Sequence, residues 1–225
     1  MNVGRIFGAV CIVCGLLFAA GCGGQKVDVP QEVVAHVDAI CTSLMRGGAG
    51  FRHAQGAATT DRLFLDIPDA AVRRAAALHF GRRLLSVDLK SLAIHPRVSV
   101  TGLFGDYICQ CFRLMCKCGV EPSRAMDFFF KGFTRFRSSC LDVPAGPRRE
   151  GESRREYRLR QYYARLFKEI YVYVLSIVQR FWLPNLSRYL PPEYHDEFRR
   201  RLKAFELPEA SSAPAAPSSR ATSKP

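Results

Sequence analysis

The chain has 225 residues, of which 33 are Lys or Arg and 20 are Asp or Glu, so its formal net charge at pH 7 is +13. A chain of this length can bury one hydrophobic core, or one core with a small appendage, which excludes several full-size domains. The excess of basic residues favours anionic partners.

The first residues have the composition of a secretory signal peptide. Met1 supplies a free amine and Arg5 a positive charge, and no charged side chain follows between Ile6 and Ala20. This apolar run is about 15 residues long, whereas a helix needs roughly 20 to span a bilayer, so a cleaved signal is favoured over a permanent transmembrane anchor. We therefore assign residues 1–21 to a signal peptide and exclude them from the fold.

The signal peptide ends in the sequence Leu17-Phe18-Ala19-Ala20-Gly21-Cys22. This stretch resembles the lipobox of bacterial lipoproteins, with Ala19 where leucine is usual, and the resemblance covers only the first 22 residues. It implies cleavage before Cys22 and a thioether link from Cys22 to diacylglycerol. It also implies an exported protein on the cell membrane or outer membrane, with residues 22–30 as a lipidated tether. A plain signal peptide that happens to end at a cysteine is the alternative.

Cleavage would remove Arg5 and no acidic residue, which leaves the mature chain with a net charge of +12. Nucleic acid is the usual partner of a basic cytosolic protein, but export argues against it. The remaining anionic partners are lipid headgroups, acidic envelope polymers and an acidic envelope protein. We expect the membrane as one partner, through the lipid anchor, and no cofactor.

Helical spacing of apolar residues predicts an amphipathic helix over 31–45. The segment 46–60 contains four glycines and little periodicity, so we expect a loop. A second helix is predicted to begin near Pro68-Asp69 and to end about Ser86.

The segment 99–118 is apolar on most sides and predicts a buried element that ends at Gly119. Another helix begins at Glu121-Pro122. Its apolar residues share one face, which we interpret as core rather than as a lipid or ligand surface; they are Met126, Phe129, Phe130, Phe133 and Cys140.

A connection rich in Pro, Gly and Arg precedes the longest predicted helix, which spans 152–183 and is ended by Pro184. Its apolar residues recur every three or four positions: Leu159, Tyr163, Leu166, Ile170, Val174, Ile177 and Phe181. A buried strand over 170–178 is a local alternative. A last helix begins near Pro192 and turns Tyr194, Phe198, Leu202 and Phe205 inward. Residues 206–225 are rich in Ser, Ala and Pro, which predicts a disordered tail.

These elements predict an all-α fold, an irregular bundle of five or six helices over 31–205 with an N-terminal lipid tether and a disordered C-terminal tail. The domain contains six cysteines: Cys41, Cys109, Cys111, Cys116, Cys118 and Cys140. Their even number in an exported chain suggests disulfides. In a continuous helix, however, the four members of the C-x-C-x4-C-x-C cluster cannot pair with one another. Only Cys41 and Cys140 lie outside the cluster, so at least two of its four thiols would stay free.

The same cluster is the candidate metal site, because the thiolates of Cys109, Cys111, Cys116 and Cys118 suit zinc, copper(I) or iron-sulfur clusters. Four thiolates reach one ion only if the chain bends between Cys111 and Cys116, and the residues between them include no Gly, Pro, Asn or Asp. Buried free or partly paired thiols are the third interpretation, and the one we favour.

The segment 148–168 carries eight basic residues against three glutamates. We predict an anionic-surface site at its start, formed by Arg148, Arg149, Arg154, Arg155 and Arg158. The ordinary alternative is a solvated helix face.

The sequence has no serine-nucleophile elbow, no Walker loop and no histidine pair at metal-binding spacing. We therefore expect a non-enzymatic envelope lipoprotein that acts as an interaction or structural module. A thiol-dependent redox or metal-binding protein is the alternative.

Overall fold

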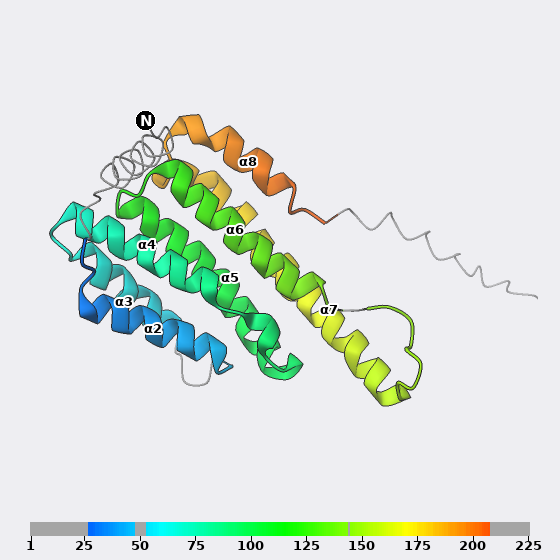
Figure 1. Ribbon diagram of the computed structural model, residues 1–225. Coiled ribbons are helices and arrows are strands. Elements are labelled where there is room, and N and C mark those ends of the chain that lie inside the picture. The colour runs from blue at the N-terminus through cyan, green and yellow to red at the C-terminus, as the bar shows by residue number, and fades with distance from the viewer. Residues whose placement is uncertain (1–26, 48–52, 144, 208–225) are drawn as a thin grey trace, which may run out of the picture.

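The computed structural model describes residues 27–47, 53–143 and 145–207. Cys22 and residues 208–225 of the predicted tail lie outside the described residues. The described chain is all-helical, as predicted (Figure 1). Its α-helices are α2 (Gln31–Met45), α3 (His53–Leu65), α4 (Ala70–Ser86), α5 (Ile94–Lys117), α6 (Pro122–Leu141), α7 (Arg154–Ile177) and α8 (His195–Lys203).

Short helical turns join the longer helices. A 3-10 turn, η1 (Leu89–Ser91), lies between α4 and α5, and two more, η3 (Leu183–Arg188) and η4 (Pro192–Tyr194), precede α8. The turn η2 (Val178–Trp182) that continues α7 is π-helical. In the described residues, no helix is both long enough and apolar enough to cross a bilayer.

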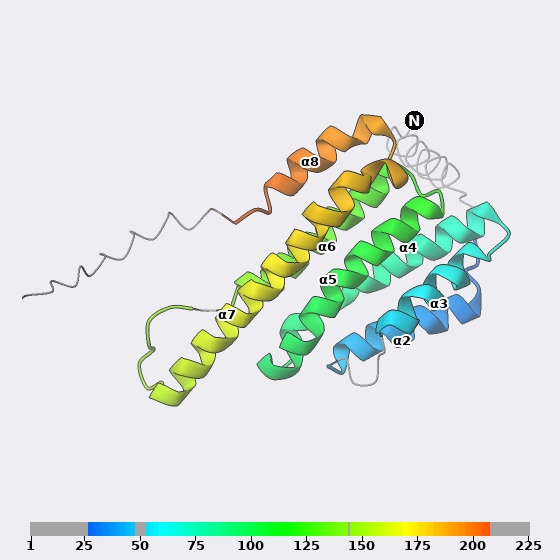
Figure 2. The ribbon, with the colours of Figure 1, turned by 180° about the vertical axis from the view of Figure 1, so that it is seen from behind.

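Helix α5 forms the centre of the bundle and packs against α4, α6 and α7 (Figure 2). Phe104, Ile108 and Phe112 are fully or almost fully buried, as expected for this apolar segment. The helix ends where predicted, because Gly119 adopts a φ of +74°, a conformation that glycine adopts without a steric penalty.

The aromatic face of α6 is core, as interpreted from the sequence. Phe129 and Phe133 are fully buried, with ring centroids 5.3 Å apart. Phe198 of α8 closes over the same rings, at 5.2 Å from Phe129. The last helix therefore covers the core through Phe198 and Leu202, both of which are buried.

The predicted loop over 46–60 is wrong in its second half, because α3 begins at His53. Two buried side chains and one ion pair hold this helix against its neighbours. Thr60 and Phe64 are fully buried, and the Asp61 carboxylate accepts two hydrogen bonds of 2.8 Å from Arg113 of α5. Packing against neighbouring elements thus stabilises a helix whose own sequence has little periodicity.

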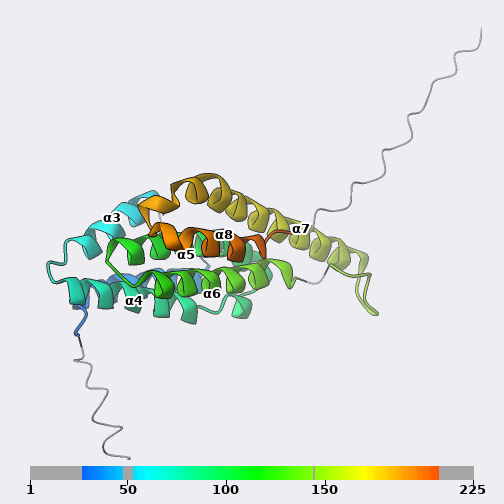
Figure 3. The ribbon, with the colours of Figure 1, turned by 90° about the horizontal axis from the view of Figure 1, so that it is seen from above.

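Helix α7 begins with a capping box, in which Ser153 Oγ accepts from the Glu156 amide and the Glu156 carboxylate accepts from the Ser153 amide. The first half of α7 projects beyond the ends of α5 and α6 (Figures 1 and 3). All its buried residues, Phe167, Tyr171, Val174 and Leu175, therefore lie in the second half. The segment 170–178 is helical, so the strand alternative is wrong.

Two members of the apolar repeat over 152–183 lie outside the core, because 49% of Leu159 and 66% of Phe181 is exposed. Leu159 lies in the projecting half of α7, where no neighbouring helix covers it. Phe181 lies in η2, where the wider π turn changes the helical phase and rotates the side chain away from the stripe of Val174 and Val178.

Candidate functional site

Exposed apolar side chains are concentrated on one element. Seven large apolar side chains are exposed in the described chain, and five of them belong to α7 and η2. These five are Leu159, Tyr162, Val172, Tyr173 and Phe181. Tyr162 is 59% exposed and Tyr173 is 65% exposed. Apolar side chains scattered singly over a protein surface need no explanation, whereas a concentration on one helix makes that helix the candidate site.

Basic residues lie among these apolar side chains. With 3.6 residues per turn, Arg155, Arg158, Tyr162, Arg165 and Tyr173 point to the same side of α7. We call the exposed surface formed by Arg155, Arg158, Leu159, Tyr162, Arg165, Val172, Tyr173 and Phe181 the α7 face.

The arginines of the α7 face have no partner within the described part of the chain. Arg155, Arg158 and Arg165 form no hydrogen bond or ion pair there. Elsewhere in the bundle some exposed arginines pair, as Arg83 does with Asp38 at 2.7 Å, and others, such as Arg74 and Arg82, have no ion-pair partner among the described residues. Of the two glutamates on α7, Glu156 caps the helix. The exposed Glu169 lies on the same side as the face, one turn from both Arg165 and Tyr173, and offsets one of its three positive charges. The α7 face is therefore positively charged and its charges are available to a ligand.

The structure divides the five predicted arginines into two groups. Arg154, Arg155 and Arg158 lie together on α7 and surround a shallow depression with Leu159 and Tyr162. Arg148 instead lies in the connection before α7, where its Nε donates to the backbone carbonyl of Glu152 at 2.6 Å.

Arg149 lies in the same connection. Its backbone amide donates to the Glu152 carboxylate at 3.0 Å, which fixes the turn. Only the helical group of arginines thus joins the exposed aromatic residues. Sequence reasoning missed Arg165, Tyr173 and Phe181, because the exposed side of the helix can be recognised only when its packed side is known.

The candidate metal ligands lie on an unbroken helix. Helix α5 runs without interruption through Cys109, Cys111 and Cys116 to Lys117. In the described residues, no group of three or more His, Cys, Asp or Glu is placed to hold a metal ion. All six cysteines of the described domain are free thiols.

Burial makes these thiols poor nucleophiles. It raises the pKa of Cys41 and Cys118 to about 11, and that of Cys116 and Cys140 to about 12. Burial also raises the pKa of Cys109 and Cys111 well above the usual value. The reactive species of cysteine is the thiolate, which is scarce at neutral pH for every one of these groups.

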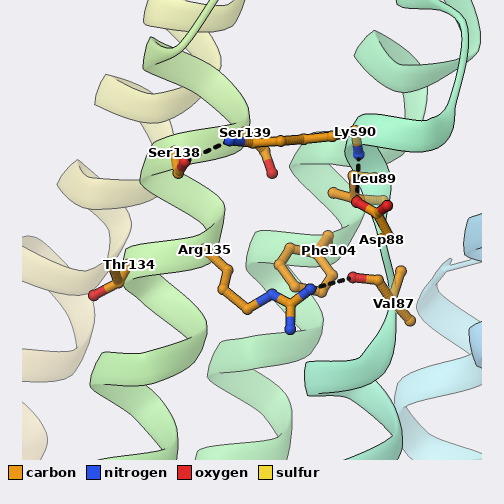
Figure 4. Close-up of a pocket in the computed structure, with 9 residues that line it drawn as sticks. All are labelled: Val87, Asp88, Leu89, Lys90, Phe104, Thr134, Arg135, Ser138 and Ser139. Carbon is orange, nitrogen blue, oxygen red and sulfur yellow. Dashed lines mark hydrogen bonds between the residues drawn. The ribbon is translucent and has the colours of Figure 1, made fainter.

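A cavity of about 320 Å³ lies between η1 and α6 (Figure 4). Its basic side chains are already engaged with the protein. Arg135 donates to the backbone carbonyls of Leu85 and Val87, and Lys90 pairs with Asp142 at 2.7 Å and donates to Ser138 at 2.9 Å. These contacts tie the α4–α5 connection to α6, so the cavity has a structural explanation.

Comparisons with known proteins identify no relative of this chain. No family model matches it, and neither does any curated protein or solved structure.

Proposed function

We propose that this chain is a cell-envelope lipoprotein, anchored through lipidated Cys22, and that it is a non-enzymatic module that binds its partner through the α7 face. One observation carries the second part: unpaired arginines and exposed aromatic side chains occupy the same side of one helix. The first part rests on the lipobox-like sequence that ends at Cys22.

The chemistry of the α7 face suits an anionic partner. Tyrosine presents a large apolar ring with a polar tip, and arginine is a strong donor to carboxylate and phosphate groups. Arginines without carboxylate partners in their own protein can bind such groups without first breaking an internal ion pair.

The thiol-dependent alternative has no comparable support. A redox or metal role for Cys109, Cys111, Cys116 and Cys118 needs accessible thiolates or thiols that converge on one ion. Their burial and raised pKa argue against the first requirement. Their distribution along α5 argues against the second.

The proposal is tested by arginine footprinting of the wild-type protein in its own envelope. The reference is the mature Cys22→Ser chain in buffer, which has no lipid anchor. Arg155, Arg158 and Arg165 should react several-fold more slowly with phenylglyoxal in the envelope. The exposed Arg74 and Arg82 of α4 provide the internal control and should react equally in both states. If the reactivity of Arg155, Arg158 and Arg165 is as similar in the two states as that of Arg74 and Arg82, the proposal is overturned.

A further inference from the structure

We propose that the α7 face lies on the anionic phospholipid headgroups of the bilayer in which the Cys22 lipid is inserted. This inference rests on the proposed function and specifies its partner. The lipid anchor would hold the bundle at the membrane, and the α7 face would fix the orientation of the bundle on it.

The side chains of the α7 face are those of helices that lie in a membrane interface. Tyrosine is enriched at the headgroup level of bilayers, where its ring is partly buried and its hydroxyl stays hydrated. Tyr162 and Tyr173 lie about three helical turns apart on the same side, and Phe181 extends the row at the end of the helix. Arg155, Arg158 and Arg165 lie between and beside them, within reach of lipid phosphates.

The shape of the α7 face fits a flat partner better than a narrow ligand. Helix α7 has 24 residues and is therefore about 36 Å long. Its first half projects from the bundle (Figures 1 and 2), and in its packed second half the side chains of Val172 and Tyr173 are still exposed. The depressions along it are shallow spaces between neighbouring side chains, such as the one lined by Arg165, Lys168 and Tyr173. A convex row of this length can contact a plane without any rearrangement of the fold.

The length of the tether is compatible with this contact. The chain between Cys22 and Pro30 reaches at most about 28 Å when fully extended. The described chain begins on the side of the bundle opposite α7 (Figure 3). Helix α2 contacts α5, and α5 contacts α7, so two interhelical spacings, or roughly 16–20 Å, separate α2 from α7. The tether can therefore cross the end of the bundle while its lipid stays in the bilayer under α7.

The anchor also increases the effect of weak contacts. A tethered surface meets its ligand at a high effective concentration, so contacts that are modest in a free protein become occupied. Each basic side chain near an anionic membrane surface strengthens binding about fivefold. The apolar side chains add a contribution that salt does not screen.

The experiment measures binding of the mature Cys22→Ser chain to lipid vesicles, so that no acyl group contributes. Vesicles of phosphatidylcholine alone are compared with vesicles that also contain phosphatidylglycerol. Binding is expected only to the anionic vesicles and should weaken as salt rises above about 0.1 M. The variant Arg155→Gln/Arg158→Gln should bind about 25-fold more weakly. The matched control Arg74→Gln/Arg82→Gln has the same net charge and should bind as the parent does.

A second pair of variants separates insertion into the headgroup layer from simple charge attraction. Tyr173→Ser/Phe181→Ser should lower the affinity for anionic vesicles on the order of tenfold at unchanged charge. Met45→Ser, which removes an exposed apolar side chain elsewhere, should leave it unchanged. All these residues are exposed, so an unchanged melting midpoint checks that each variant is folded.

The outcomes distinguish this inference from the proposed function. Equal binding of the two arginine variants would overturn the membrane contact, as would the absence of binding to anionic vesicles. If the α7 arginines are nevertheless protected in the native envelope, the proposed function stands and the partner is an acidic protein or polymer. Binding of polyglutamate, but not of anionic vesicles, would favour that class of partner.

Discussion

Arg160 and Glu152 form a two-point ion pair: Nε of Arg160 donates to Oε1 of Glu152, and Nη2 donates to Oε2, both at 2.8 Å. The two side chains are only 12% and 11% exposed. Arg160 also donates to the carbonyl of Pro147 at 2.9 Å. The pair therefore holds the connection before α7 against the helix itself.

The ionisation of Glu152 should reflect this pair. Hydrogen bonds from Arg160, and a further one from the Arg149 amide, lower the pKa of Glu152 to about 2 from a usual value of 4.5. Because the pKa is lower in the folded state, the pair stabilises the fold fully above about pH 4.5, and this stabilisation is lost as the pH falls through about 2. An NMR titration of the Glu152 carboxyl carbon should show its midpoint near pH 2. In Arg160→Gln the midpoint should move up toward 4.5, and a midpoint near 4.5 in the parent would contradict the geometry.

The thiols should be protected from reagents in the folded protein. At pH 8, a thiol with a pKa of about 11 is thiolate only on the order of one part in a thousand, and burial excludes the reagent as well. Protein purified without reductant should react slowly with a thiol reagent. After denaturation, at least two of Cys109, Cys111, Cys116 and Cys118 should become modified. Complete disulfide pairing within one chain would refute the continuous α5 helix, and stoichiometric zinc or iron would favour the metal site.

Two helical glycines should respond to alanine in opposite directions. A Cβ at Gly132 would lie 2.4 Å from Cδ1 of Ile108 and 3.0 Å from its Cγ2, so Gly132→Ala should destabilise the protein by about 1–2 kcal/mol. A Cβ at Gly102 would lie 3.8 Å from Cγ2 of Ile170, an ordinary contact. Gly102→Ala should therefore stabilise the protein by about 0.5–1 kcal/mol through helix propensity. Denaturant unfolding measures both, and a loss of stability in Gly102→Ala equal to that in Gly132→Ala would contradict the packing of α5 against α7 described at Gly102.

The C-terminal boundary of the fold can be located by truncation. Glu206 still accepts a hydrogen bond of 2.9 Å from Gln179, so we place the cut after Leu207. Deletion of 208–225 should leave the melting midpoint unchanged, because these residues have no apolar periodicity to bury. A chain that ends at Leu183 should not fold, since it loses the buried Leu186, Leu190, Phe198 and Leu202, each worth about 1.5–3 kcal/mol. Equal loss of stability in both truncations would show that the tail is docked.

The periodicity of the sequence predicted most of the fold. Apolar spacing located α2 and α6, Pro68-Asp69 located the start of α4, and Gly119 located the end of α5, because these signals depend on local geometry. Helix α3 was missed because its contacts, such as Asp61 with Arg113, join positions far apart in the chain. Such partners cannot be identified from the helix sequence itself.

The candidate site was predicted only at its start. Arg154, Arg155 and Arg158 form an obvious basic cluster in the sequence. The spacing of Leu159 and Phe181 fits the apolar repeat of α7, so the sequence does not distinguish them from the buried members of that repeat. Periodicity does not reveal where a helix projects beyond its neighbours, or where a π turn shifts its phase. Those two features expose Leu159 and Phe181 beside the arginines.

The most direct test of the account is the mass of the N-terminal peptide of the mature protein, isolated from its own envelope. We expect this peptide to begin at Cys22 and to carry a diacylglyceryl group on the Cys22 sulfur, and we expect the Cys22→Ser protein to leave the membrane fraction. Only Cys22 follows the small residues at the end of the apolar run. An unmodified Cys22 on the mature chain would contradict the lipid anchor, and with it the membrane-held orientation of the α7 face.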